Sequence, residues 1–312
     1  MKLRRMLGEY KFKYLMHREV AHTFRLQKNH DIQSVILMEA HRLEKSMCQA
    51  KQEPKRGYSR AQALLTYIER IYTSEERDGC LFALETGISV IHAFAEYKAK
   101  VDAGSDELLA LNTALENAKV MALDNSKWGG VMVAEKPEAS FEAAEKLFKS
   151  RHSCRSFSDT SIDMEKLKQA ISLAQYAPSA CNRQPHRVYL VSDETLAKAK
   201  GRNGVNDYAA PYHLIVTVDC TAYTFYDFND WIVSASMYTG YLTLALHSVG
   251  IGSCIMRKPL YENDEYIQLL RNVCKIPEKE KIVIELYIGN YPNSFIAPIS
   301  RRLSVAEVLK IV

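Results

Sequence analysis

The 312-residue sequence lacks the features that identify several large classes of protein. It has no apolar run approaching the 18 or more residues of a membrane-spanning helix, and its basic N-terminus lacks the apolar core and cleavage site of a signal peptide. It also has no internal repeat and no low-complexity segment. With 47% apolar and 25% charged residues, the composition is that of a globular protein and excludes a disordered or collagen-like chain.

The sequence has seven cysteines and no C-x-x-C pair. An odd number of cysteines without paired spacing is most simply explained by free thiols in a reducing compartment. We therefore expect a cytoplasmic protein without structural disulfides.

Several catalytic motifs are also missing. There is no P-loop, no G-x-S-x-G and no H-E-x-x-H, and Gly250-Ile-Gly252 is too short for a dinucleotide fingerprint. The nine histidines are scattered, so no metal pair is predicted. The sequence therefore gives no direct support for a nucleophilic or metal-dependent mechanism.

The net charge of +4 is too small to indicate nucleic-acid binding. The first 30 residues are nevertheless basic, with eight lysines and arginines against two glutamates. A solvated helix face is the favoured interpretation. Contact with a membrane surface or an anionic partner remains an alternative for this segment.

Proline is scarce in the first half, since only two of the nine prolines precede residue 150. Apolar residues recur there every three or four positions, which is the spacing of amphipathic helices. We predict helices over 1–125 within a helical domain of unknown role over 1–135. A linker then leads to a second domain over 140–312.

The second half mixes helices and strands without a clean βαβ repeat, which favours an α+β fold. Asp163 is the expected N-cap of the helix that follows it. The weakly charged helix over 230–249 is expected to be buried or to lie in a subunit interface. The predicted strands are 187–191, 214–218, 253–256 and 282–288, and the predicted helices are 140–150, 164–175, 194–200, 230–249 and 262–273, with a short helix or arm at 305–309.

Three polar clusters in this half could bind a ligand. The segment Arg151–Phe157 reads RHSCRSF, and its two guanidinium groups could grip a phosphate. The segment 177–185 reads APSACNRQP, in which two prolines bracket residues able to form hydrogen bonds. The pair Arg301 and Arg302 forms the third cluster. Alone, each cluster could be an ordinary basic turn or loop.

In combination, these clusters resemble the FMN-dependent nitroreductase family. RHSxRxF is followed by APSAxNxQP and a strand, and further matches come in the family's order. The resemblance covers about 145–312 and does not extend to the first 140 residues. The further matching segments are AP at 210–211, LALHSVGIGS at 244–253, GNYP at 289–292 and RLSVAEV at 302–308.

The resemblance implies a nitroreductase-like mixed or antiparallel sheet flanked by helices, preceded here by an all-α domain. It implies FMN as cofactor, NAD(P)H as co-substrate, a small-molecule electron acceptor and a ping-pong mechanism. It also implies a homodimer with FMN at the interface, near the helix over 230–249. Because the flavin performs the redox step, no catalytic side chain is assigned.

The resemblance also assigns cofactor-binding residues. Arg151, Ser153 and Arg302 match positions that bind the FMN phosphate and ribityl chain, and Arg155 matches the cation at the N1/O2 edge of the ring. Residues 178–182 match a loop that reaches the partner subunit's flavin. The full set is Arg151, His152, Ser153, Arg155, Pro178, Ser179, Ala180, Asn182, Gln184, Asn203, Arg301 and Arg302.

Some positions depart from the family pattern. His186 stands where the family often has Trp or Tyr, and a Glu-Gly pair expected around Met256 is absent. The segment 221–231 is short where larger members insert helices that cover the substrate. We therefore expect part of the N-terminal domain to pack against the flavin domain and narrow the mouth of the site.

Two alternatives stay open. A relative in the same superfamily could use FMN for dehalogenation or oxidation of a heterocycle. A flavin-binding regulatory or scaffolding protein with little turnover would explain the long helical extension. Cys154 and Cys181 lie inside the proposed FMN segments, and we expect them to be packing residues rather than a redox pair.

Overall fold

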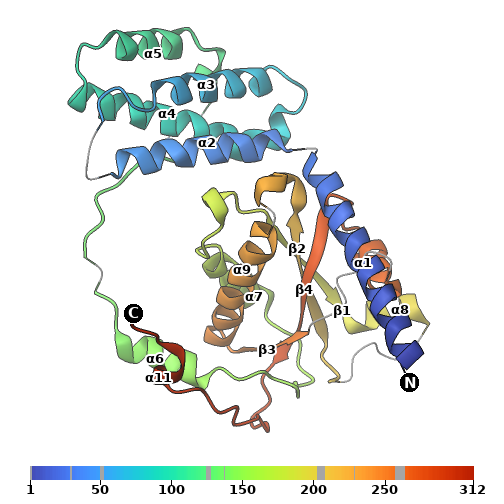
Figure 1. Cartoon of the computed structure of the whole chain (residues 1–312). Coiled ribbons are helices and arrows are strands. Elements are labelled where there is room, and N and C mark those ends of the chain that lie inside the picture. Colours follow the sequence, from blue (N-terminus) through green and yellow to red (C-terminus); the bar gives the residue numbers. More distant parts are fainter. Residues whose placement is uncertain are drawn as a thin grey trace.

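The computed structural model describes residues 2–28, 30–49, 53–123, 128–136, 138–201, 208–227, 229–256 and 264–312. Within them, a bundle of helices lies beyond one end of an antiparallel sheet that is flanked by further helices (Figure 1). The predicted α+β fold class is therefore confirmed, as is the helical character of the N-terminal region.

The sheet has four strands in the order β1-β2-β4-β3, and every neighbouring pair is antiparallel. The strands β2 and β4 are central and almost wholly buried, which explains their continuous apolar runs. All four predicted strands are present, each longer than its apolar run. They are β1 (His186–Ser192), β2 (Tyr212–Asp219), β3 (Ile251–Met256) and β4 (Glu280–Asn290).

Helices cover both faces of the sheet. Successive side chains of a strand point to opposite faces, so Leu214 and Val216 of β2 pack with α7 (Met164–Ala174) and α9 (Asp230–Ser248). Ile215 packs on the other face with α8 (Asp193–Lys200) and α10 (Glu265–Cys274). Asp163 caps α7 as predicted, because its carboxylate accepts hydrogen bonds from the first turn. The remaining helices are α6 (Phe141–Ser150) and α11 (Val305–Val308).

The N-terminal bundle has a hydrophobic core of its own. It contains α2 (Ile32–Met47), α3 (Tyr58–Tyr72), α4 (Leu81–Val101) and α5 (Asp106–Asn117). Within the described residues, Arg77–Val101 is the one helical stretch long and apolar enough to cross a membrane. Its most apolar window is 56% buried, and α4 supplies many of the core residues, which accounts for its composition.

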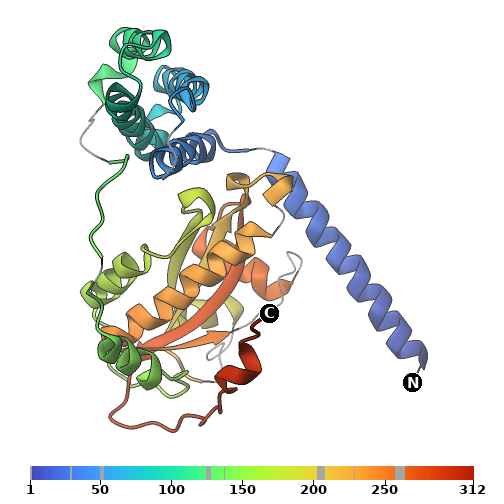
Figure 2. The ribbon, with the colours of Figure 1, turned by 60° about the vertical axis from the view of Figure 1, so that its left-hand side comes forward.

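The first helix, α1 (Lys2–Lys28), leaves the bundle, contacts the sheet unit through its C-terminal part and projects away from it towards the N-terminus (Figure 2). The buried ammonium group of Lys281 on β4 lies 2.9 Å from Glu19 Oε2 and 3.0 Å from Thr23 Oγ1. Leu26 joins the apolar cluster that contains Val218 and Trp231. By its packing, α1 therefore belongs with the sheet rather than with the bundle.

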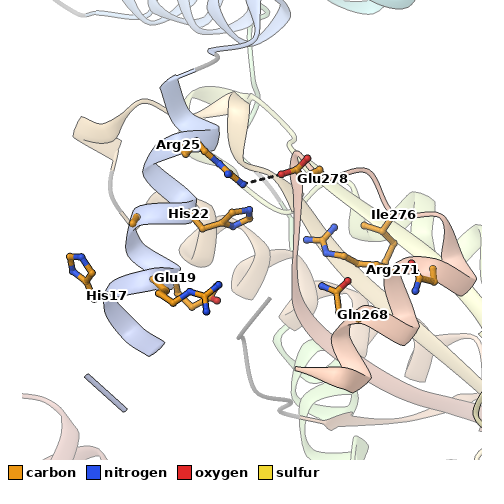
Figure 3. A pocket seen from close by; sticks show the side chains of 11 residues that line it. His17, Glu19, His22, Arg25, Gln268, Arg271, Ile276 and Glu278 are labelled. Carbon is orange, nitrogen blue, oxygen red and sulfur yellow. Dashed lines mark hydrogen bonds and ion pairs between the residues drawn. The ribbon is translucent and has the colours of Figure 1, made fainter. Parts of the chain in front are cut away.

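A groove of about 690 Å³ separates α1 from α10 (Figure 3). At its rim, Arg25 Nη2 lies 3.0 Å from Glu278 Oε1, with both side chains largely exposed. An ion pair this exposed contributes little to stability. The buried contacts of Lys281 and Leu26 are therefore what fasten α1 to the sheet unit.

Candidate functional site

The first polar cluster lies against the edge strand β3. Arg151 ends α6 in an extended conformation, and the chain then runs beside the sheet. The amide of Cys154 donates to Ser253 O at 2.9 Å, and the amide of Ser158 donates to Asn290 O at 3.0 Å. These bonds fix the segment beside β3 and at the end of β4.

The side chains of this segment differ in their exposure to solvent. Cys154 is buried beneath Gly252, where an added Cβ would lie 2.9 Å from the Cys154 sulfur. Burial raises the pKa of the Cys154 thiol, so this cysteine is a packing residue rather than a reactive one. Ser153 is half-buried and Arg155 is exposed, with its guanidinium 5.9 Å from the centre of the Tyr208 ring.

A histidine that the sequence analysis did not select lies beside this segment. His247 Nε2 lies 2.8 Å from Ser150 Oγ, and its Nδ1 lies 3.1 Å from the Tyr291 hydroxyl. Burial lowers the pKa of His247, and the positive charges of Arg151 and His152 lower it further. The sequence feature that could have pointed to His247 is its place as an ionisable residue near the end of the mostly apolar helix α9.

The second polar cluster is a rigid loop between α7 and β1. Cys181, Asn182 and Gln184 all have φ near +50°, a left-handed conformation that is costly for residues other than glycine. The Ser179 hydroxyl accepts a 3.0 Å hydrogen bond from the Gln184 amide, which closes the loop on itself. Asn182 is exposed at its tip.

Arg183 anchors this loop to the body of the protein. Its side chain is 2% exposed, and Nη1 lies 2.8 Å from Ala222 O and 3.2 Å from Asp227 Oδ2. Partial burial opposes ionisation of Asp227, but its bonds with Arg183 and Thr224 lower its pKa overall. A charge pair held in this way keeps the strained loop in one conformation.

The two clusters lie at opposite ends of the sheet (Figure 1). The first cluster contacts Ser253 of β3, which pairs with Ile288 of β4. The second cluster directly precedes His186 of β1, which pairs with Val218 of β2, and Val218 pairs in turn with Lys281 of β4. Ile288 lies seven residues along β4 from Lys281, a distance of about 23 Å. One chain therefore does not bring the two clusters together.

The remaining predicted cofactor-binding residues are Asn203, Arg301 and Arg302. Asn203 lies outside the described residues. Arg301 and Arg302 are exposed in the C-terminal tail, where Arg302 donates to the Ser300 carbonyl. In the same tail Ile296 and Ile299 are each 96% exposed, so its apolar side chains are not buried within one chain.

A cavity of about 550 Å³ lies between the bundle and the second cluster. Leu37 and Phe82 line it from the bundle, and Gln184 and His186 line it from the sheet unit. His186 stacks on Tyr238 with ring centres 3.9 Å apart. The N-terminal helices thus pack against the loop that carries predicted cofactor-binding residues.

The match to a family model covers residues 148–215 and is described as "Nitroreductase family". Over these residues the chain is similar to the nitroreductase family. It contains both polar clusters, from Arg151 through Gln184, so the resemblance predicted from these motifs is confirmed.

Individual proteins are also similar to part of this chain. A protein of Archaeoglobus fulgidus named as an NADH dehydrogenase/NAD(P)H nitroreductase is 28% identical over 150 residues, which are 47% of this chain and 84% of the relative. An iodotyrosine dehalogenase 1 homolog of Caenorhabditis elegans is 25% identical over 199 residues, covering 52% of this chain and 59% of the relative.

Solved structures of the nitroreductase family also align with part of this chain. An FMN-dependent nitroreductase of Clostridium difficile is 24% identical with a TM-score of 0.41, and covers 50% of this chain and 92% of its own. A nitroreductase of Desulfovibrio desulfuricans in complex with FMN is 20% identical with a TM-score of 0.44, covering 56% and 96%.

The first cluster has the chemistry that a flavin phosphate requires. Its accessible donors are two guanidinium groups and a serine hydroxyl, held on a segment whose backbone is fixed by the sheet. Within the described part of the chain, no three His, Cys, Asp or Glu side chains are placed to hold a metal ion. The guanidinium groups and the serine hydroxyl of the first cluster fit the phosphate group of FMN.

Proposed function

We propose that this nitroreductase-family oxidoreductase uses FMN to transfer electrons from NAD(P)H to a small organic acceptor, such as a nitro compound or a quinone, by a ping-pong mechanism. The observation that supports it best is the pair of polar clusters, each fixed by buried contacts and each presenting polar side chains to solvent.

Different residues of this chain would bind different parts of FMN. Arg151, His152 and Ser153, with Arg301 and Arg302 of the tail, would hold the phosphate and ribityl chain. Arg155 would place its charge at the N1/O2 edge of the ring, where negative charge gathers on reduction. When bound, FMN supplies the hydride chemistry, so the chain needs to bind and orient the reactants.

The proposed site is completed by a second copy of the chain. The second cluster is separated from the first cluster of its own chain by about 23 Å along β4. Its predicted cofactor-binding residues are Pro178, Ser179, Ala180, Asn182 and Gln184. On α9, Val233, Met237 and Tyr241 recur every four residues and are 52%, 41% and 46% exposed. This apolar stripe supports a homodimer in which each loop reaches the partner's FMN.

The cofactor and the electron donor can be tested directly. Purified protein should show the visible absorption bands of oxidised flavin. Mixing it with NADH or NADPH in a stopped-flow instrument, with no acceptor present, should bleach those bands. Flavin that neither nucleotide reduces would exclude the nicotinamide part of the proposal.

Dehalogenation is the second candidate, because one relative is an iodotyrosine dehalogenase 1 homolog. A turnover screen should therefore include nitroaromatics, quinones, oxygen and iodinated phenols with the same reduced enzyme. Preference for the iodinated compounds would favour dehalogenation. Tight FMN binding without turnover of any acceptor would favour a regulatory or scaffolding role.

The N-terminal helices would cover the proposed site. The amide of Asp31 donates to Thr221 O at 2.9 Å, and the bundle shares a cavity with Gln184. These contacts support a role for the extension in shaping access to the flavin, in place of the helices that are inserted in larger relatives. The seven free thiols also support the proposed cytoplasmic location.

A further inference from the structure

His247 connects three parts of the chain that are distant in sequence. Ser150 comes from the end of α6, His247 from the last turn of α9, and Tyr291 from the residue after β4. The His247 and Tyr291 rings meet edge to face with centres 5.8 Å apart, and Tyr291 stacks on Phe295. The imidazole is thus held in one orientation with both nitrogens engaged.

The charges around this imidazole are positive. Arg151 and His152 follow Ser150 directly and act on His247 electrostatically. The same Arg151 charge acts on Tyr291, the neighbour from the end of β4, whose pKa burial raises to about 12. The nearby Cys154 thiol is protonated, since burial raises its pKa. An entering anion would therefore meet an arginine and two histidines.

His247 also has access to the solvent through Ser150. Ser150 is exposed and precedes the segment that carries Arg151 and Ser153, whereas His247 itself is half-buried. A histidine that served only the core would pair with an interior group. Here Nε2 faces a hydroxyl at the entrance to the predicted phosphate cluster.

We propose that His247, through Ser150 and Tyr291, is a positioning residue for the phosphate monoester of FMN, and that it takes up a proton from solvent when the phosphate binds. The inference rests on the proposed function and adds to it a residue outside the twelve predicted positions. No covalent bond changes in this step. Binding consumes up to one proton, which stays on the imidazole, so that both ring nitrogens would donate, one to Ser150 Oγ and one to the Tyr291 hydroxyl.

The test compares FMN with riboflavin, which lacks the phosphate. Flavin fluorescence quenching with the full chain gives both dissociation constants between about pH 8 and about pH 6, the range in which histidine titrates. Wild type should bind FMN more tightly as the pH falls. The phosphate's own second pKa, near 6, limits this trend at the acid end.

Replacing His247→Gln keeps a hydrogen-bonding side chain but cannot take up the proton. We expect about tenfold weaker FMN binding at about pH 6, the effect of losing one charge-assisted hydrogen bond, with riboflavin binding unchanged. His92→Gln, on α4 of the bundle, is the matched control and should behave as wild type. Equal FMN binding by His247→Gln and wild type at every pH would overturn the inference, as would an equal loss for FMN and riboflavin.

A second measurement needs no variant. The C2 proton resonance of His247 should titrate at higher pH when FMN is added, and inorganic phosphate should produce the same shift if the phosphate group alone is recognised. A shift with FMN but not with inorganic phosphate would still support the inference and show that the flavin positions the phosphate. An unchanged titration with bound FMN would refute it, and absence of FMN binding in wild type would remove the proposed function together with it.

Discussion

Single residues fix the geometry of both polar clusters. Gly252 allows β3 to approach the buried Cys154, while Arg183 holds a loop in which three side-chain-bearing residues adopt left-handed conformations. These anchors leave Ser153, Arg155 and Asn182 accessible to solvent. The proposed binding groups are therefore on rigid supports before any ligand arrives.

The close approach at Gly252 predicts the effect of a methyl group. In Gly252→Ala the new Cβ would lie 2.9 Å from Cys154 Sγ and 3.2 Å from Tyr291 Cδ1, so the segment that carries Arg151 must shift. We expect a loss of about 1–3 kcal/mol in unfolding free energy and weaker FMN binding. Urea denaturation and FMN titration measure the two effects.

Gly79→Ala is the control for this substitution, because no heavy atom lies within 4 Å of its added Cβ. It should leave FMN binding unchanged. If the two variants bound FMN equally well, contact between Gly252 and the first cluster would not matter for the site.

His186 predicts an acid-dependent stability. Burial, followed by the charge of Arg187, lowers its pKa from 6.5 to about 4. Between these values the unfolded chain binds the extra proton and the folded chain does not, so stability falls as the pH drops from about 6.5 to about 4. The cost is about 3 kcal/mol over that range.

His186→Phe keeps a ring to stack on Tyr238 but cannot titrate. Its unfolding free energy, measured by urea denaturation across this pH range, should fall less steeply than that of wild type. His92→Gln should keep the wild-type slope. Parallel pH profiles for wild type and His186→Phe would show that another group causes the acid sensitivity.

At the residue scale, sequence patterns predicted the positions whose chemistry is local. The motifs around Arg151 and Ser179 and the cap at Asp163 depend on neighbours in the chain, so the sequence could reveal them. His247 was missed because its partners, Ser150 and Tyr291, are 97 and 44 residues away. Contacts between residues so far apart in the chain produce no periodic pattern in the sequence.

At the element scale, hydrophobic periodicity predicted the helices and strands but not where each helix packs. The helix α1 follows the same three-to-four-residue rule as the bundle helices, yet it packs on the sheet. Glu19, Thr23 and Leu26 make these contacts with residues from the last third of the chain. Only the tertiary structure could show that pairing.

The attachment of α1 depends on Lys281. Lys281→Met removes the buried ammonium group that lies 2.9 Å from Glu19 Oε2. Breaking a buried pair in this way costs about 3–5 kcal/mol, so α1 should become more accessible to proteases and exchange its amide hydrogens faster. Limited proteolysis and hydrogen exchange detect this change.

Glu278→Gln is the control for this prediction, since it breaks the exposed Arg25–Glu278 pair at the rim of the same groove. Its effect should be less than about 1 kcal/mol. Comparable exposure of α1 in both variants would mean that the rim pair, rather than Lys281, holds the helix.

At the scale of the whole molecule, the separation of the two clusters predicts that FMN binding depends on dimerisation. Met237→Glu places a charge in the middle of the exposed α9 stripe, where Met237 is 41% exposed. We expect a monomer with strongly reduced FMN affinity, measured by light scattering and flavin titration. A monomeric wild type loaded with FMN would contradict the dimer.

Leu109→Glu provides the matched control for the dimer test. Leu109 lies on α5 of the bundle and is 67% exposed. The substitution therefore introduces the same charge at an apolar surface position away from α9. This variant should remain dimeric and bind FMN as wild type does. Dissociation of both variants would place the interface elsewhere or show a general effect of added charge.

The bundle itself can be removed while α1 is retained. Replacing residues 32–123 with a short flexible linker should open the cavity at Gln184 and raise the turnover of bulky acceptors relative to small ones. Steady-state kinetics with a small and a bulky quinone measure this ratio. An unchanged ratio, with FMN still bound, would mean that the bundle serves another partner.

The contact between Glu19 and Lys281 joins residues that are 262 positions apart. At about 5–20 residues per second, a ribosome needs roughly 13–52 s to make the intervening chain. During that interval α1 has been synthesised, but the strand that receives it does not yet exist. The part of α1 that carries Glu19 must therefore wait, exposed or shielded by a chaperone, until β4 has been made.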